Sequence, residues 1–310
     1  MGNSVIIDTD PGQDDAVALL LALGSTLDVL AVTVGAGNVP LDLTVKNALK
    51  VCDLANRSDL PVYAGAGGPL EGELVTAEHV HGPSGLDGYD LPPPSRLASE
   101  GFAPDKIVEL IMNRPAGEVT LCTLGPLTNV ALALRLEPTI AGRLSRIVMM
   151  GGGFFEGGNT TPAAEFNIYV DPVAAAEVFS SGIDLVMMPL DVTHQVLSNP
   201  DRVRSFKEIG NLAGEVVAGW IGFFDRYDME KYGTEGAPLH DPCVIAYLLE
   251  PGLFSGRFCN VEIETESPLT RGMTVVDWWG VSGRTPNAHV MRHVDADGFF
   301  SLLVRTVGML

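Results

Sequence analysis

The chain has 310 residues, of which 46% are hydrophobic, so it is long enough to bury a large core. It carries 39 aspartates and glutamates against 19 lysines and arginines, a formal net charge of −20. A chain this acidic repels polyanions, which argues against binding to nucleic acid or to anionic membrane surfaces. Small molecules, metal cations and neutral partners fit the charge better, although ordinary soluble surfaces are also often acidic.

The cysteines give no sign of a metal ribbon or a disulfide framework. They are far apart in the sequence and form no Cys-x-x-Cys pair: Cys52, Cys122, Cys243 and Cys259. No positive charge precedes the apolar stretch at the N-terminus, so we expect no signal peptide and a cytoplasmic location with reduced thiols. The longest apolar region, 16–34, is broken by a polar turn and predicts a helix, a turn and a strand instead of a membrane span.

Short apolar runs alternate with longer amphipathic segments along the chain. The apolar runs predict strands at 4–7, 29–34, 62–63, 119–124, 146–150 and 185–189. The segments between them predict helices at 16–23, 42–55, 104–113, 127–137 and 172–181. The last part of the chain, from Val261, mixes strand signals and ends in an apolar helix at 298–307. Such alternation is typical of parallel strands joined by crossover helices.

Two stretches interrupt this rhythm and are predicted to be long loops. Residues 65–101 are rich in glycine and proline, and residues 151–167 read GGGFFEGGNTTPAAEFN. Loops this long in a compact domain are usually functional or disordered. No linker divides the chain, so we expect one α/β domain over residues 1–310, with an open, mostly parallel sheet flanked by helices. Ligands of such sheets bind at the carboxyl ends of the strands.

Four aspartates crowd the turn after the first predicted strand, in IIDTDPGQDDAVALLLAL. Asp8 and Asp10 end the strand, and Asp14 and Asp15 open the next helix. A helix dipole offers about half a positive charge, which cannot neutralise four carboxylates. The nearest basic residue in the sequence is Lys46. Hard oxygen ligands favour Ca²⁺ or Mg²⁺ over zinc, although two aspartates at a helix start can also be a simple solvated cap.

The segment DTDPGQDDAVAL resembles the N-terminal signature of the inosine-uridine-preferring nucleoside hydrolases. The resemblance continues through GN at 37–38, HGPSGL at 81–86, LGPLTNVA at 124–131, MMGGG at 149–153, NTTPAAEFNIYVDPVAA at 159–175 and HDP at 240–242. It covers essentially the whole chain. It implies hydrolysis of the N-glycosidic bond of ribonucleosides to ribose and free base, with one bound Ca²⁺ and a homodimeric or homotetrameric assembly.

The resemblance also implies a metal site and two catalytic residues. The metal ligands would be the carboxylates of Asp10, Asp15 and Asp241 and the backbone carbonyl of Leu124, a set that suits calcium. The ion would acidify and orient a bound water, from which Asp10 takes a proton as general base. His240 would protonate the leaving base, because histidine titrates near neutral pH. A plain residue at a helix start is the alternative reading of His240.

Further residues match the positions that bind substrate in this family. The ribose would contact Asp14, Asn38, Asn159, Glu165 and Asn167, with Met150 at a strand end beside them. His81 resembles the histidine that contacts the base. These side chains could otherwise be ordinary loop residues and, for Met150, a core residue.

Base preference is expected to depend on residues 223–241. Phe224, Asp228 and Tyr232 fall where relatives place side chains that read the base, and Tyr227 and Tyr232 could each reach it with a phenol. These residues match neither the pattern of pyrimidine-specific relatives nor that of purine-accepting ones. We expect a pyrimidine nucleoside, uridine first, with purine or broad specificity as the alternative. Core packing of a helix is the alternative reading of these aromatic residues.

Two other functions fit parts of the sequence. A magnesium-dependent phosphatase could use Asp8 and Asp10, but it needs a lysine that grips phosphate, and no such lysine is evident. A non-catalytic nucleoside sensor would not need both Asp10 and His240.

Overall fold

The computed structural model describes residues 4–232 and 236–310, and the side chains of residues 225–232 lie outside this description. In the described part, eight strands form one sheet in the order β3-β2-β1-β4-β5-β6-β10-β7. All pairings are parallel except that of β10 with the edge strand β7. The strands are β1 (Ser4–Thr9), β2 (Asp28–Val34), β3 (Val62–Ala64), β4 (Val119–Thr123), β5 (Arg146–Met150), β6 (Leu185–Met188), β7 (Phe254–Cys259) and β10 (Ala288–Val294). The predicted α/β class and mostly parallel sheet are confirmed.

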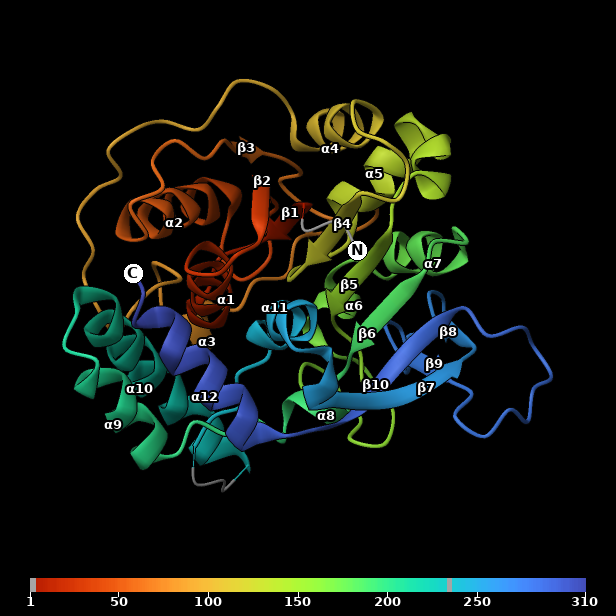
Figure 1. Cartoon of the computed structure of the whole chain (residues 1–310). Helices are drawn as coiled ribbons and strands as arrows, with labels where there is room; N and C mark the ends of the chain where they lie inside the picture. Colours follow the sequence, from red (N-terminus) through yellow and green to blue (C-terminus); the bar gives the residue numbers. More distant parts are fainter. Residues whose placement is uncertain (1–3, 233–235) are drawn as a thin grey trace.

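Helices cover both faces of the sheet (Figure 1). One core cluster lies under α1 (Gln13–Leu23), α2 (Leu41–Leu54), α9 (Pro200–Glu208), α10 (Leu212–Tyr232), α11 (Pro242–Leu249) and α12 (Ala296–Val307). The other lies under α4 (Ala103–Met112), α5 (Thr128–Leu136) and α7 (Pro172–Ser180). The shorter elements are α3 (Glu78–His81), η1 (Pro138–Gly142), α6 (Phe166–Val170), α8 (Leu190–Thr193), η2 (Pro251–Leu253) and the antiparallel pair β8 (Val261–Ile263) and β9 (Thr274–Val276).

The central strands are apolar on both sides because both of their faces are covered. In β1, Val5 and Ile7 belong to one core cluster and Ile6 to the other. In β4, Cys122 and Leu121 divide in the same way. This alternation explains why the strands read as continuous apolar runs in the sequence.

Helix α1 is the centre of its layer. All of its residues from Gln13 to Ala22 are buried, and it packs against α2, α10, α11 and α12. Its N-cap is Gly12, and the side chain of Asp15 accepts a 2.9 Å hydrogen bond from the Gly12 N–H. A helix that is apolar on every side below its first turn needs such enclosure. In the described residues, no helix has both the length and the hydrophobicity needed to cross a bilayer.

The predicted strands and helices are present, and most of their ends lie within three residues of the expected positions. Strand β1 continues to Thr9, so Asp8 lies inside the strand and not in the turn. The expected loop at 151–167 ends at Glu165, because α6 begins at Phe166. The expected loop at 65–101 contains the short helix α3. The sequence patterns did not predict α9 or α10, nor the strands β7 and β10.

Candidate active site

The cavity lies at the carboxyl ends of β1 and β4, where the strand order reverses. From β1 the sheet runs one way through β2 and β3 and the other way through β4, β5 and β6. Such a switch point leaves a crevice that binds ligands in doubly wound sheets. Here it forms a cavity of about 600 Å³ whose lining includes these predicted residues: Asp14, Asn38, His81, Leu124, Met150, Asn159, Glu165, Asn167, His240 and Asp241.

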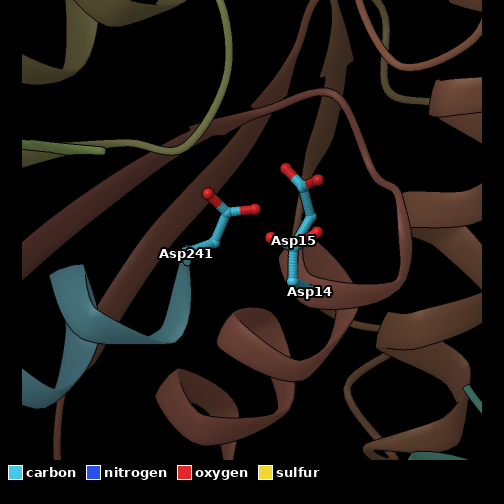
Figure 2. A group of neighbouring side chains, drawn as sticks. All are labelled: Asp14, Asp15 and Asp241. Carbon is cyan, nitrogen blue, oxygen red and sulfur yellow. The ribbon is translucent and has the colours of Figure 1, made fainter. Parts of the chain in front are cut away.

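Three aspartates from two distant parts of the chain come together at this cavity. Figure 2 shows Asp14 and Asp15 at the start of α1 and Asp241 at the start of α11, with the side chain of Asp241 beside those of the other two. One carboxylate oxygen of each of the three lies within 4.8 Å of the others, and all three residues are buried. Burial and the repulsion of neighbouring aspartates raise the pKa of Asp241 well above its usual range. Metal-binding clusters have this form.

Asp10 lies next to this group, and its two carboxylate oxygens have different surroundings. Its Oδ2 accepts a 2.7 Å hydrogen bond from the Asn38 N–H. Its Oδ1 is buried and has no hydrogen-bond partner among the described residues. Burial, followed by the charge of Asp15, raises the pKa of Asp10 well above its usual range. A buried oxygen without a partner costs free energy, so it needs a proton or a cation.

Two glycines allow Asp10 to occupy this position. A Cβ on Gly37 would lie 2.0 Å from Asp10 Oδ2, and a Cβ on Gly125 would lie 2.1 Å from Asp10 Oδ1. The chain therefore closes around the carboxylate from both sides. In the described part of the chain, no lysine or arginine lines the cavity. The buried oxygens and the missing positive side chain together fit a hard divalent cation.

Asp15 is held in one orientation by its neighbours. Its Oδ1 accepts from Thr9 Oγ1 at 2.5 Å and from the Asp10 N–H at 3.3 Å. Its Oδ2 accepts from the Gly12 N–H and from Asn38 Nδ2, both at 2.9 Å. Donors of this kind fix the direction of a metal ligand. Asn38, predicted as a ribose contact, therefore also supports the carboxylate group.

Several residues that line the cavity are joined to one another by hydrogen bonds. Asn167 Nδ2 donates to the Leu124 carbonyl at 2.7 Å and to the Met150 carbonyl at 3.3 Å. The Leu124 oxygen keeps a second lone pair for a ligand. Glu165 accepts from the Asn167 N–H at 2.9 Å and from the Gly152 N–H at 2.8 Å. Asn159 accepts from the Phe166 N–H at 2.9 Å.

His240 also lines the cavity and lies directly before Asp241 in the chain. Its Nδ1 is 2.7 Å from Thr193 Oγ1, and its ring centroid is 5.7 Å from that of His194. Burial, with smaller contributions from His194 and His81, lowers the pKa of His240 well below its usual range. Thr193 and His194 were not predicted. They lie almost fifty positions from His240 in the sequence, and no pattern in the sequence joined them to it.

His81 was expected in an open loop but ends helix α3 and is buried. Its ring stacks on Phe224, with centroids 5.6 Å apart, and its Nδ1 is 2.6 Å from Gln13 Oε1. Gln13 was missed, although a lone amide between the aspartates and an otherwise apolar helix was a usable signal.

Two expectations need a different account. Asp8 does not join the turn, because its Oδ1 accepts hydrogen bonds from Thr33 Oγ1 of β2 at 2.6 Å and from Asn129 Nδ2 of α5 at 2.9 Å. Burial raises the pKa of Asp8 to about 7. The side chains of Tyr227, Asp228 and Tyr232 lie outside the described residues.

Comparison with known proteins identifies the family. The model of the inosine-uridine preferring nucleoside hydrolases matches residues 5–301. An uncharacterized protein of Schizosaccharomyces pombe is 52% identical over 307 residues, 99% of each chain. The pyrimidine-specific ribonucleoside hydrolase RihA of Escherichia coli K12 is 47% identical over 305 residues, 98% of this chain and 97% of RihA. The structure of a purine-preferring ribonucleoside hydrolase from Gardnerella vaginalis superposes with a TM-score of 0.92 at 29% identity, covering 98% of both chains. The chain belongs to the inosine-uridine preferring nucleoside hydrolase family.

Proposed function

We propose that this protein hydrolyses the N-glycosidic bond of ribonucleosides to ribose and free base, with a divalent cation at the floor of the cavity. The observation that carries the proposal is the buried carboxylate group at the switch point of the sheet, with Asp10 Oδ1 left without a partner. Membership of the family and the size of the cavity support it.

We propose calcium as the cation. Asp10, Asp15, Asp241 and the Leu124 carbonyl would hold it, and Asp14 lies close enough to take part. All of these donors are oxygens, and calcium accepts six to eight of them. When bound, the ion would supply positive charge and Lewis acidity toward water and the ribose hydroxyls.

Residues of the chain would transfer the protons and stabilise the charge of the transition state. Asp10 would take the proton of the water that attacks C1′ of the ribose, because it is the carboxylate with a free buried oxygen. The negative charge around it would stabilise the oxocarbenium-like transition state. His240 would donate to the leaving base through Nε2, because its Nδ1 is already engaged by Thr193.

We propose a preference for pyrimidine nucleosides, uridine first. RihA, at 47% identity, is named for pyrimidine specificity, whereas the purine-preferring neighbour is 29% identical. The cavity of about 600 Å³ is large enough for either base, so the proposal is a preference for pyrimidines and not an exclusion of purine nucleosides.

The test is a product assay on the calcium-loaded protein. Uridine, cytidine, inosine and adenosine are each incubated with the enzyme, and free base and ribose are measured by chromatography. We expect release of both products, fastest from uridine, and a loss of at least ~10³-fold in kcat for Asp10→Asn. Asp201→Asn, at an exposed position, is the control. Intact nucleosides, or hydrolysis of a phosphomonoester in their place, would refute the proposal.

His240 is tested separately by the choice of leaving group. His240→Gln is expected to slow uridine hydrolysis far more than hydrolysis of a p-nitrophenyl riboside, whose leaving group needs no proton. Equal losses on both substrates would remove His240 from base departure.

A further inference from the structure

The amide of Gln13 makes three contacts around the end of helix α3. Gln13 Nε2 donates to the His81 carbonyl at 2.8 Å and to the Asp87 carbonyl at 3.0 Å. Gln13 Oε1 lies 2.6 Å from Nδ1 of the His81 ring. One side chain at the start of α1 thus holds both the backbone and the ring of His81.

These contacts decide which way the amide points. Two carbonyl oxygens can be satisfied only by the NH₂ group, so the amide nitrogen must face His81 O and Asp87 O. A flipped amide would set three oxygens against one another. The oxygen of Gln13 therefore faces the ring, and as an acceptor it requires a proton on His81 Nδ1.

The ring carries one N–H, which lies at Nδ1. Burial lowers the pKa of His81 to about 3, so the imidazole is neutral near pH 7. With its proton on Nδ1, a neutral imidazole has an unprotonated Nε2 that can only accept a hydrogen bond. His81 lines the cavity, and among the described residues Gln13 is the only hydrogen-bond partner of its ring.

The surroundings keep the ring in this place. A Cβ on Gly12 would lie 2.4 Å from His81 Nδ1, so only glycine lets the ring approach the turn before α1. The ring also stacks on Phe224 with an interplanar angle of 26°. Asn47 Nδ2 links the loop after His81 to the turn before α1, because it donates to the Pro11 and Ser84 carbonyls at 3.1 and 2.8 Å.

We infer that Gln13 is a positioning residue that fixes His81 as the Nδ1–H tautomer, so that His81 Nε2 accepts an N–H from the nucleobase. The inference rests on the proposed function and narrows its substrate class to nucleosides whose base presents an N–H at this point. Uracil does so with its N3–H. A base methylated at that nitrogen offers no proton to His81 Nε2, which is then left buried without its partner.

The tautomer is measured first, without any substrate. Protein labelled with ¹⁵N-histidine gives a separate nitrogen spectrum for each ring, and His81→Gln identifies the signals of His81 among the six histidines. We expect His81 to show a protonated Nδ1 and an unprotonated Nε2. Gln13→Met should move it toward the Nε2–H form, and Gln13→Glu, which keeps an acceptor, should not. A wild-type His81 protonated at Nε2 would overturn the inference.

The consequence for specificity is measured next, as kcat/KM for uridine and for 3-methyluridine. We expect the ratio of the two values in the wild type to fall about tenfold in Gln13→Met, the size of one buried hydrogen bond. Gln195→Met is the matched control, because Gln195 Nε2 also donates to two carbonyls, those of Asp191 and Arg292, but does not contact His81. It should leave the ratio unchanged.

The outcomes separate the inference from the proposed function. If uridine is hydrolysed and the ratio is the same in wild type and Gln13→Met, the discrimination is steric and the inference is wrong. If the wild type hydrolyses neither nucleoside, the proposed function is wrong, and the nitrogen spectrum still decides the tautomer of His81.

Discussion

At the scale of single residues, the site depends on glycines, which have no side chain, as well as on the polar residues beside them. Asp10 can lie against the backbone only because residues 37 and 125 are glycines. Neither glycine has a positive φ, so a larger residue there would not strain the backbone. It would instead clash with the side chain of Asp10.

Gly37→Ala is therefore expected to displace Asp10 while the fold persists. Its Cβ would lie 2.0 Å from Asp10 Oδ2, and the carboxylate must move to make room. A displacement of about 1 Å in a catalytic group costs on the order of 10²-fold in rate. We expect a loss of that size in kcat with uridine, with an unchanged circular dichroism spectrum.

Gly142→Ala is the matched control, because a Cβ on Gly142 meets nothing within 4 Å. Equal activities for Gly37→Ala and Gly142→Ala would show that the position of Asp10 does not limit the reaction.

At the scale of elements, the loop 151–165 is held by the residue that caps the next helix. Glu165 is the N-cap of α6 and accepts hydrogen bonds from Asn167 and Ile168, and its Oε2 also accepts from the Gly152 N–H. One carboxylate thus joins the end of β5 to the start of α6 and sets the place of Asn167 in the cavity.

Glu165→Ala should lower both stability and substrate affinity. Loss of the cap costs about 1 kcal/mol in the free energy of unfolding, and the freed backbone N–H groups add to it. We expect urea denaturation to show this loss and the KM for uridine to rise. Asn199→Ala, which removes the cap of the remote α9, should lower stability by a similar amount with an unchanged KM. A rise in KM in both variants would show that the effect on KM comes from the loss of stability and not from the position of Asn167.

The elements also show what the sequence could and could not predict. The central strands were found because both faces are covered and their apolar runs are continuous. Helix α10 was not found because Gly214, Gly219 and Gly222 interrupt its pattern, and its formation depends on packing. Gly219, for example, lies against the backbone of Gly88, where a Cβ would be 2.9 Å from the Gly88 carbonyl oxygen. The place of β10 between β6 and β7 is likewise set by contacts between distant segments.

For the candidate site, too, some contacts could be anticipated from the sequence and others could not. Asp14 and Asp15 lie close to Asp241, although more than 220 positions separate them from it in the sequence. The family resemblance had pointed to Asp10, Asp15 and Asp241 as ligands, and Asp10 lies outside this group of three. The supporting contacts of Thr193 and Gln13 were not predictable, because a hydrogen bond between distant residues leaves no periodic pattern in one sequence.

At the scale of the whole molecule, the buried aspartates of the site make the stability of the fold depend on pH and on bound metal. Burial raises the pKa values of Asp10, Asp15 and Asp241 in the metal-free fold above those of the unfolded chain, and repulsion by neighbouring aspartates adds to the rise for Asp10 and Asp241. The folded state then binds more protons than the unfolded state, so the stability of the metal-free protein falls as pH rises through the raised pKa values. A bound cation removes this penalty.

Metal removal is therefore expected to cost more at pH 8 than at pH 5.5. We predict that the difference in Tm between calcium-loaded and metal-free protein is larger at the higher pH. Asp10→Asn should narrow the difference in Tm at pH 8. Asp53→Asn, at a half-buried position whose pKa is lowered, should not. A metal-free protein that is more stable at pH 8 than at pH 5.5 would contradict the raised pKa values.

The central claim is that the carboxylates at the switch point hold a divalent cation. Its most direct test is calorimetric titration of calcium into metal-free protein, at a pH where the carboxylates are ionised. We predict one site per chain, lost or weakened by at least ~10-fold in Asp10→Asn and in Asp241→Asn, in line with removal of a charged ligand. Absence of binding by calcium or any other divalent cation, together with full uridine hydrolysis in excess chelator, would contradict the account.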